Sequence, residues 1–395
     1  MTRIQLLLVS MVGALAAALV PISALVILPP EGYGTFSFGY LVFAFGWSLQ
    51  LSIICDSWAR TRGVSGLSSA WTSYWPPVMQ LSMLAGVAAG AATAAVFHDV
   101  SIALLLIVSV ALNLYRLGGR FYYSAMGHRR LPVGSDASTI AVFAATFIVF
   151  RMVPIGDDLF TVTLSWATSS LAGALFFLPA KAARGSGLVS WYRARKKVVH
   201  TLLGDSLFMD LGANAVPAVL APLLGAKSFG IYRGISSVAT PVQLILDPLR
   251  PALAQLTLST LAGRRYLFAV TGIAGIMAGG CYVVLAAVVP QTGLATTTLG
   301  SLSEFSVACA VFVAMNFLGH FYYIASRNHL PRRELFAGRV LQTVGAIAGP
   351  IGGLLLGGLT GAIWGFVAAG ALSSGGWLLL VQYQHQRQGS EAPVH

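Results

Sequence analysis

The residues best placed for chemistry are polar side chains inside otherwise apolar segments. Asn113, Arg116 and Arg120 follow one another at spacings of three and four residues, so a helix would carry them as one stripe. Two guanidinium groups on one helix face suit a diphosphate or another polyanion, because each planar fork binds oxyanion oxygens in pairs. Arg116 would lie about one turn deeper in the membrane than Arg120, which can also extend towards the interface.

A second stripe consists of Ser206, Asp210 and Asn214 at four-residue spacing, followed by Pro217. A carboxylate near the middle of a membrane span is either protonated or paired with a cation. We therefore predict Asp210, with Asn214, to be the proton- or cation-linked switch of the protein. A static contact between two helices is the alternative interpretation.

Further ionisable residues are secondary candidates. Arg233 is a third candidate for binding a diphosphate, or for reaching the outer headgroups. Asp247 and Arg250, three residues apart, are expected to pair with each other. His320 is expected to be a hydrogen-bonded structural residue.

Several catalytic signatures are absent from the sequence. It has no nucleotide-binding loop, no HExxH or CxxC motif, and no serine–histidine–aspartate order on a plausible soluble scaffold. Cys55, Cys281 and Cys309 all lie in apolar stretches and are expected to pack as small core residues. We therefore expect neither an enzyme, a metal nor a cofactor, and a transporter would take its energy from a gradient or the membrane potential.

The elements that must position these residues follow from the composition. Of 395 residues, 56% are hydrophobic and only 9% are charged, and the mean hydropathy is +0.78. So few charges cannot solvate the surface of a soluble fold, which leaves an all-α, polytopic membrane protein. Apolar windows predict twelve membrane-spanning helices, at 4–28, 35–55, 76–97, 101–126, 135–153, 159–180, 201–223, 228–257, 266–289, 302–326, 338–357 and 360–382.

Basic residues alternate between successive loops. The basic loops hold Arg60 and Arg62, Arg129 and Arg130, Lys181 to Lys197, Arg264 and Arg265, and Arg327 to Arg333. The other loops are mostly acidic, which predicts that both termini face the cytoplasm. The net charge of +12 thus reflects membrane topology and contact with membrane lipids, not nucleic acid.

The two halves of the sequence resemble each other. Gly119-Arg120-Phe121-Tyr122-Tyr123 recurs as Gly319-His320-Phe321-Tyr322-Tyr323, and Leu131-Pro132 recurs as Leu330-Pro331. A further echo relates Pro30-Glu31-Gly32-Tyr33-Gly34-Thr35-Phe36 to Ala226-Lys227-Ser228-Phe229-Gly230-Ile231-Tyr232. We predict a duplication of six helices. The expected domains are a first lobe at 1–180, a basic linker at 181–200, a second lobe at 201–383 and a polar tail at 384–395.

In the runs Pro30 to Phe36 and Ala226 to Tyr232, the sequence resembles the O-antigen flippase type of polysaccharide transporter. That type belongs to the multidrug/oligosaccharidyl-lipid/polysaccharide exporter superfamily. The resemblance implies a multi-pass protein of the bacterial cytoplasmic membrane that flips a polyprenyl-diphosphate-linked oligosaccharide by alternating access, for cell-surface polysaccharide biosynthesis. It also implies a cationic cavity for the diphosphate, for which Arg116, Arg120 and Arg233 are the candidates.

The expected partners are the lipid-linked glycan, which is the substrate, and glycosyltransferases or a polymerase of the same pathway. The protein itself is expected to be a monomer. Two other functions stay open. One is a cation-coupled small-molecule or multidrug exporter of the same superfamily, using Asp210. The other is a membrane-embedded glycan polymerase or ligase, against which the short outer loops argue.

Overall fold

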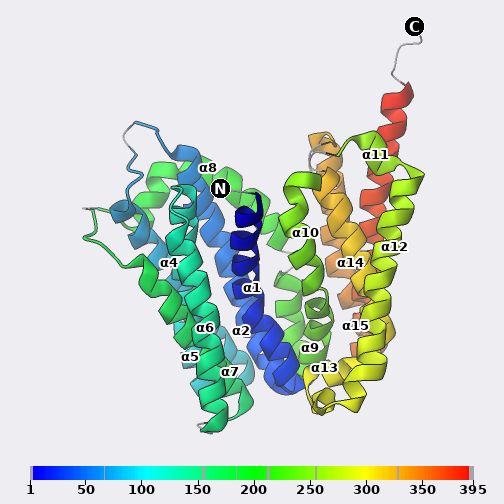
Figure 1. Ribbon diagram of the computed structural model, residues 1–395, viewed down its shortest axis with the longest axis horizontal. Helices are drawn as coiled ribbons and strands as arrows, with labels where there is room; N and C mark the ends of the chain where they lie inside the picture. Colours follow the sequence, from blue (N-terminus) through cyan, green and yellow to red (C-terminus); the bar gives the residue numbers. More distant parts are fainter. Residues whose placement is uncertain are drawn as a thin grey trace. The chain divides into compact units, whose positions relative to one another are not determined.

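Figure 1 shows the protein as a computed structural model. The structure describes residues 3–65, 67–153, 156–183, 185–210, 214–253, 256–326 and 329–390. Within these ranges, the described side chains exclude those of 3–10, 205, 208, 209, 244, 247–252, 332 and 388–390.

Regular secondary structure in the described part of the chain is entirely helical, which confirms the predicted all-α class. The α-helices are α1 (Arg3–Ile27), α2 (Pro30–Gln50), α3 (Asp56–Thr61), α4 (Trp71–Phe97), α5 (Val100–Ala125), α6 (Arg130–Met152), α7 (Asp158–Ala174), α8 (Leu188–Asp210), α9 (Val216–Val238), α10 (Thr240–Leu253), α11 (Leu258–Ala262), α12 (Arg264–Val283), α13 (Thr298–Ser301), α14 (Ser306–Ser326) and α15 (Arg332–Ser390). A π-helical turn at Leu51–Cys55 joins α2 to α3.

Eight helical segments of the described residues are long and apolar enough to cross a membrane. The sequence predicts twelve spans, and one glycine site accounts for part of the difference. Two predicted spans lie within α15, which is broken at Gly357 and Gly358, where Gly358 has a φ of 60°. Helix α9, which is not among the eight segments, kinks at Gly225, with a φ of 71°, between the spans predicted at 201–223 and 228–257. Left-handed backbone of this kind favours glycine, which has no Cβ.

The chain divides into two compact units. Unit 1 comprises Met1–Ala24 and Glu31–Ala226, and unit 2 comprises Leu25–Pro30 and Lys227–His395. In this division, α8 and the start of α9 belong to unit 1. Helix α15 extends through Ser390, so the first part of the predicted polar tail is helical. The lobes, linker and tail predicted from the sequence stay a prediction.

Helix α8 is held to unit 1 by two long side chains in the segment predicted to be a linker. The Trp191 indole donates to the carbonyl of Ile53 at 2.9 Å. Arg195 stacks 3.7 Å from the centre of the Trp191 ring and donates to the Thr61 hydroxyl at 3.1 Å. Burial lowers the pKa of the Arg195 guanidinium. These contacts fix a basic segment against an aromatic core.

That aromatic core gathers side chains from three helices of unit 1. Trp58, Tyr74 and Tyr122 pack with ring centroids 4.9 to 5.5 Å apart, and Trp71 lies 5.1 Å from Tyr122. Rings at these distances add to the free energy gained by burying apolar area. The cluster holds the ends of α3, α4 and α5 together.

An aromatic contact in each unit supports the internal repeat. Tyr123 packs on Phe177 with centroids 5.5 Å apart, and Tyr323 packs on Trp377 at 5.3 Å. Both members of the second pair lie 200 residues after those of the first, the same offset as between Gly119-Arg120-Phe121-Tyr122-Tyr123 and its second copy. The two halves thus use equivalent positions for equivalent packing.

Candidate functional site

The polar stripe of α5 lies inside unit 1. Its helix begins at Asp99, whose carboxylate accepts from the backbone N–H of Ile102 at 3.0 Å and so caps the first turn. Further along, Asn113 and Arg116 are buried, with Arg116 only 2% exposed. The three- and four-residue spacing therefore brings Asn113, Arg116 and Arg120 onto one face of α5, which is turned towards α6.

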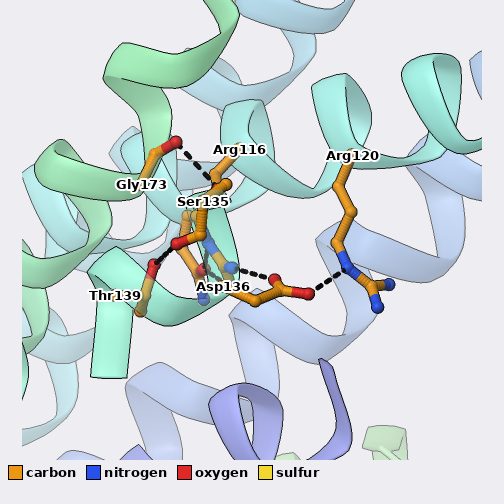
Figure 2. Close-up of polar contacts among 7 residues, drawn as sticks. Arg116, Arg120, Ser135, Asp136, Thr139 and Gly173 are labelled. Carbon is orange, nitrogen blue, oxygen red and sulfur yellow. Dashed lines mark hydrogen bonds and ion pairs between the residues drawn. The ribbon is translucent and has the colours of Figure 1, made fainter. Parts of the chain in front are cut away.

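Each of the three guanidinium nitrogens of Arg116 donates a hydrogen bond to a side chain of α5 or α6 (Figure 2). Its Nη1 lies 2.9 Å from Oδ1 of Asp136. Its Nε and Nη2 donate to Oδ1 of Asn113 at 3.1 and 3.0 Å. A buried guanidinium requires this degree of pairing, because desolvating a charge costs several kcal/mol. Arg116 is therefore part of the interior of unit 1.

Asp136 of α6 connects the two arginines. Its side chain is 3% exposed, and its Oδ2 lies 2.8 Å from Nε of Arg120 (Figure 2). Our sequence analysis did not identify this residue. The signal was available, because Asp136 is an acidic residue near the start of a predicted span. Together the three side chains carry one net positive charge.

Small residues of two other helices let the backbone approach this network. A Cβ on Gly173 of α7 would lie 2.4 Å from both Cδ of Arg116 and Oγ1 of Thr139. Gly173 also accepts a hydrogen bond from Ser135 at 2.9 Å through its carbonyl (Figure 2). A Cβ on Gly13 of α1 would lie 2.0 Å from Nη2 of Arg120. Both glycines therefore lie where a larger residue would displace an arginine.

Arg120 differs from Arg116 in accessibility. Its side chain is 35% exposed, and only its Nε is bonded to an acceptor among the described residues. Figure 2 shows the two terminal nitrogens pointing away from Asp136. A guanidinium has five N–H donors, so Arg120 keeps a planar fork that can bind an oxyanion.

The second predicted stripe also lies in unit 1, where α8 faces α2. Asn214 Nδ2 donates to Oδ1 of Asp210 at 2.9 Å, and Ser48 of α2 is a further hydrogen-bonding neighbour of that carboxyl. One turn away, the hydroxyls of Ser52 and Ser206 are hydrogen-bonded to each other. The two helices thus form a ladder of oxygen-bearing side chains.

Asp210 is 8% exposed, and no basic side chain lies within ion-pair distance of it among the residues that the structure describes. Unlike Asp136, its carboxyl is surrounded by neutral groups. A buried carboxyl in such surroundings takes up a proton or a cation more readily than one paired with arginines.

The other sequence candidates lie elsewhere. Arg233 belongs to unit 2, on α9 beyond the kink, and its backbone carbonyl accepts from Ser236 at 2.8 Å. His320 is on α14, with its ring centroid 6.5 Å from that of Tyr323. The side chains of Asp247 and Arg250 lie outside the described residues. No group of three or more His, Cys, Asp or Glu side chains in the described part of the chain could hold a metal ion.

Comparison with known proteins identifies the fold. No protein-family model matches the sequence, and no curated protein matches it either. Solved structures do match. An inward-facing conformation of a multidrug resistance MATE family transporter of the MOP superfamily is 13% identical, with a TM-score of 0.64, covering 97% of this chain and 96% of the other.

An outward-facing conformation of such a transporter gives a TM-score of 0.53 at 14% identity, covering 98% of this chain and 95% of the other. A MATE structure in the bent conformation gives 0.54 at 13% identity over 98% of this chain and 95% of the other. Identities this low establish similarity of fold alone. The chain is therefore an all-helical protein that is similar in fold, over nearly its whole length, to MATE transporters of the MOP superfamily.

Proposed function

We propose that this protein is a transporter that flips a polyprenyl-diphosphate-linked oligosaccharide across the bacterial cytoplasmic membrane by alternating access. Its fold is similar to that of transporters whose structures include inward- and outward-facing conformations. The observation that carries the substrate class is the Arg120 guanidinium, which Asp136 fixes through Nε, while the two terminal nitrogens have no acceptor among the described side chains. An oxyanion is the ligand that such a fork binds best.

The network assigns different roles to the two arginines of α5. Arg116 is buried and each of its three guanidinium nitrogens donates a hydrogen bond to Asp136 or Asn113, so it holds the carboxylate in place. Arg120 is the residue that contacts the diphosphate.

The experiment is a leaflet-resolved flipping assay with purified protein in vesicles containing a lipid-linked oligosaccharide. Arg120→Gln should lower the initial flipping rate by about tenfold to a hundredfold, the equivalent of roughly 1.5–3 kcal/mol for a charge-assisted hydrogen bond. The matched control is Arg130→Gln, which removes an exposed arginine at the start of α6. An unchanged rate in Arg120→Gln would exclude Arg120 from substrate binding.

A cation-coupled small-molecule exporter is the second candidate, and Asp210 favours it. A buried carboxyl among Ser48, Asn214 and the Ser52–Ser206 pair offers oxygen ligands without a competing arginine. Protonation or cation binding there would change the charge between α2 and α8. The same step could also drive glycan flipping, so Asp210 by itself does not select the substrate.

Transport driven by an imposed pH or sodium gradient separates these functions. For an exporter of this kind, vesicles containing the protein should accumulate a cationic dye when the gradient is applied, and Asp210→Asn should abolish that accumulation. Asp158→Asn is the control, because Asp158 pairs with Arg151 at a partly exposed position. If the protein flips the glycan and transports no dye, the flippase function stands. In that case, glycan flipping that no longer depends on the gradient in Asp210→Asn would identify Asp210 as the coupling residue.

Localisation in the inner membrane, a monomeric state and association with glycosyltransferases or a polymerase complete the proposal. They follow from the function and from the apolar helices. Crosslinking in cells, followed by identification of the crosslinked partners, tests the association.

A further inference from the structure

Unit 2 contains a cationic side chain that our sequence analysis passed over. Arg339 lies on α15, seven residues after the helix begins at Arg332, or about 10 Å along its axis. It donates to the hydroxyl of Tyr323 on α14, and its guanidinium carbon lies 4.5 Å from the centre of the Tyr323 ring. Tyr323 in turn packs against the buried Trp377.

The internal repeat relates this place to the arginine site of unit 1. Tyr323 and Trp377 correspond to Tyr123 and Phe177 at an offset of 200 residues. The helix α14 therefore corresponds to α5, and the start of α15 after Leu330-Pro331 corresponds to α6 after Leu131-Pro132. Each unit thus places an arginine between the same two helices of the repeat.

The two arginines come from opposite members of the helix pair. In unit 1, Arg120 comes from α5 and its carboxylate partner from α6. In unit 2, Arg339 comes from α15, while the position of Arg120 is taken by His320. The depth is also similar, because Arg120 lies five residues before the end of α5, or about 8 Å along the axis. Sequence alignment of the repeats alone would not have matched these residues.

The charge of Arg339 has no carboxylate partner in the described part of the chain. Glu334, on the same helix, lies 3.9 Å from Arg387. The described acceptor of Arg339 is the neutral Tyr323 hydroxyl. The Arg339 side chain is partly exposed, so its remaining N–H donors can reach an acceptor outside the protein. Intramembrane arginines of this kind normally face a ligand, a water-filled cavity or a partner.

We propose that Arg339 forms a second oxyanion-binding site, in unit 2, for the diphosphate of a lipid-borne substrate. This inference rests on the proposed function for its choice of ligand. Tyr323 orients the guanidinium through its ring and hydroxyl, and the Trp377 ring packs against that of Tyr323. The site differs from that of Arg120 because no carboxylate lowers its affinity for an anion.

Equilibrium binding of radiolabelled farnesyl diphosphate to the full-length Arg120→Gln protein in phosphatidylcholine nanodiscs tests this site, because that substitution removes the diphosphate contact proposed in unit 1. The Arg120→Gln protein is the parent protein for every variant compared below. Arg339→Gln should weaken binding at least fivefold, whereas Arg339→Lys should retain part of the affinity because it keeps the charge but not the fork. The matched control is Arg333→Gln, an exposed arginine on the same helix. Binding of farnesol, which lacks the diphosphate, should be the same in all variants.

Two results would overturn the inference: binding by Arg339→Gln within twofold of the parent protein, or an equal loss in Arg333→Gln. A third arm replaces part of the lipid with phosphatidylglycerol. If that lipid displaces the probe in the parent protein but not in Arg339→Gln, the residue binds ordinary anionic headgroups and the substrate site is refuted. If Arg339→Gln does not fold, Tyr323→Phe removes the anchoring hydroxyl and should weaken binding by a smaller factor.

The outcome is independent of the flipping assay. Failure of the proposed function would show as unchanged flipping in Arg120→Gln, whereas failure of this inference would show as unchanged diphosphate binding in Arg339→Gln. Each measurement therefore tests one site in one unit.

Discussion

Replacing Asp136 with alanine should destabilise the protein more than any other single change in the α5–α6 network. Asp136 and Arg116 are each 3% exposed in their side chains and lie 2.9 Å apart. Removing one partner of such a pair leaves an uncompensated buried charge, which costs about 3–5 kcal/mol. Arg116 would keep Asn113 as an acceptor, which offsets part of this cost without supplying a negative charge.

The measurement is thermal unfolding of the purified, full-length protein in detergent, followed by circular dichroism. At about 2–4 °C per kcal/mol for a domain of this size, Asp136→Ala should lower the Tm by roughly 6–20 °C. The Tm of Asp136→Asn should lie between those of the unmodified protein and Asp136→Ala, because the amide oxygen can still accept a hydrogen bond from Arg116.

The double variant Asp136→Ala with Arg116→Leu provides the control. It removes both charges, and apolar replacements of buried ion pairs are often neutral or stabilising. Its Tm should therefore be higher than that of Asp136→Ala alone. An unchanged Tm in Asp136→Ala, or a double variant less stable than the single one, would refute the assignment of this pair as a buried, coupled unit.

Two further predictions concern contacts within unit 1. Gly34→Ala should sharply reduce the yield of folded protein, because its Cβ would lie 2.0 Å from the backbone carbonyl oxygen of Ala226. The control is Gly272→Ala, whose Cβ would have nothing within 4 Å and which should express normally. Size-exclusion chromatography compares the yields of the two variants. Arg195→Ala should lower the stability by about 1–3 kcal/mol and speed proteolysis at the start of α8, because it removes the stacking on Trp191 and the bond to Thr61, and equal cleavage rates would contradict this.

Sequence by itself determined the features that depend on local periodicity. Hydropathy showed an all-helical membrane protein, because few charges and long apolar windows leave no other class. Three- and four-residue spacing placed Asn113, Arg116 and Arg120 on one face of α5, and in the structure Arg116 bonds to Asn113 while both arginines contact Asp136. The repeat likewise followed from matching residues at offsets of 196 to 200 residues. The orientation of the termini stays a prediction from the loop charges.

Tertiary structure decided which helix supplies each partner. Asp136 neutralises the arginines of α5 from the next helix, and Tyr323 orients Arg339 from the preceding one. Helical periodicity tells which residues share a face, but not which face of another helix packs against it. Packing also assigned α8 to unit 1 through Trp191, although its basic composition suggested a linker. Such pairings depend on helix rotation and close approach, which short-range sequence patterns do not encode.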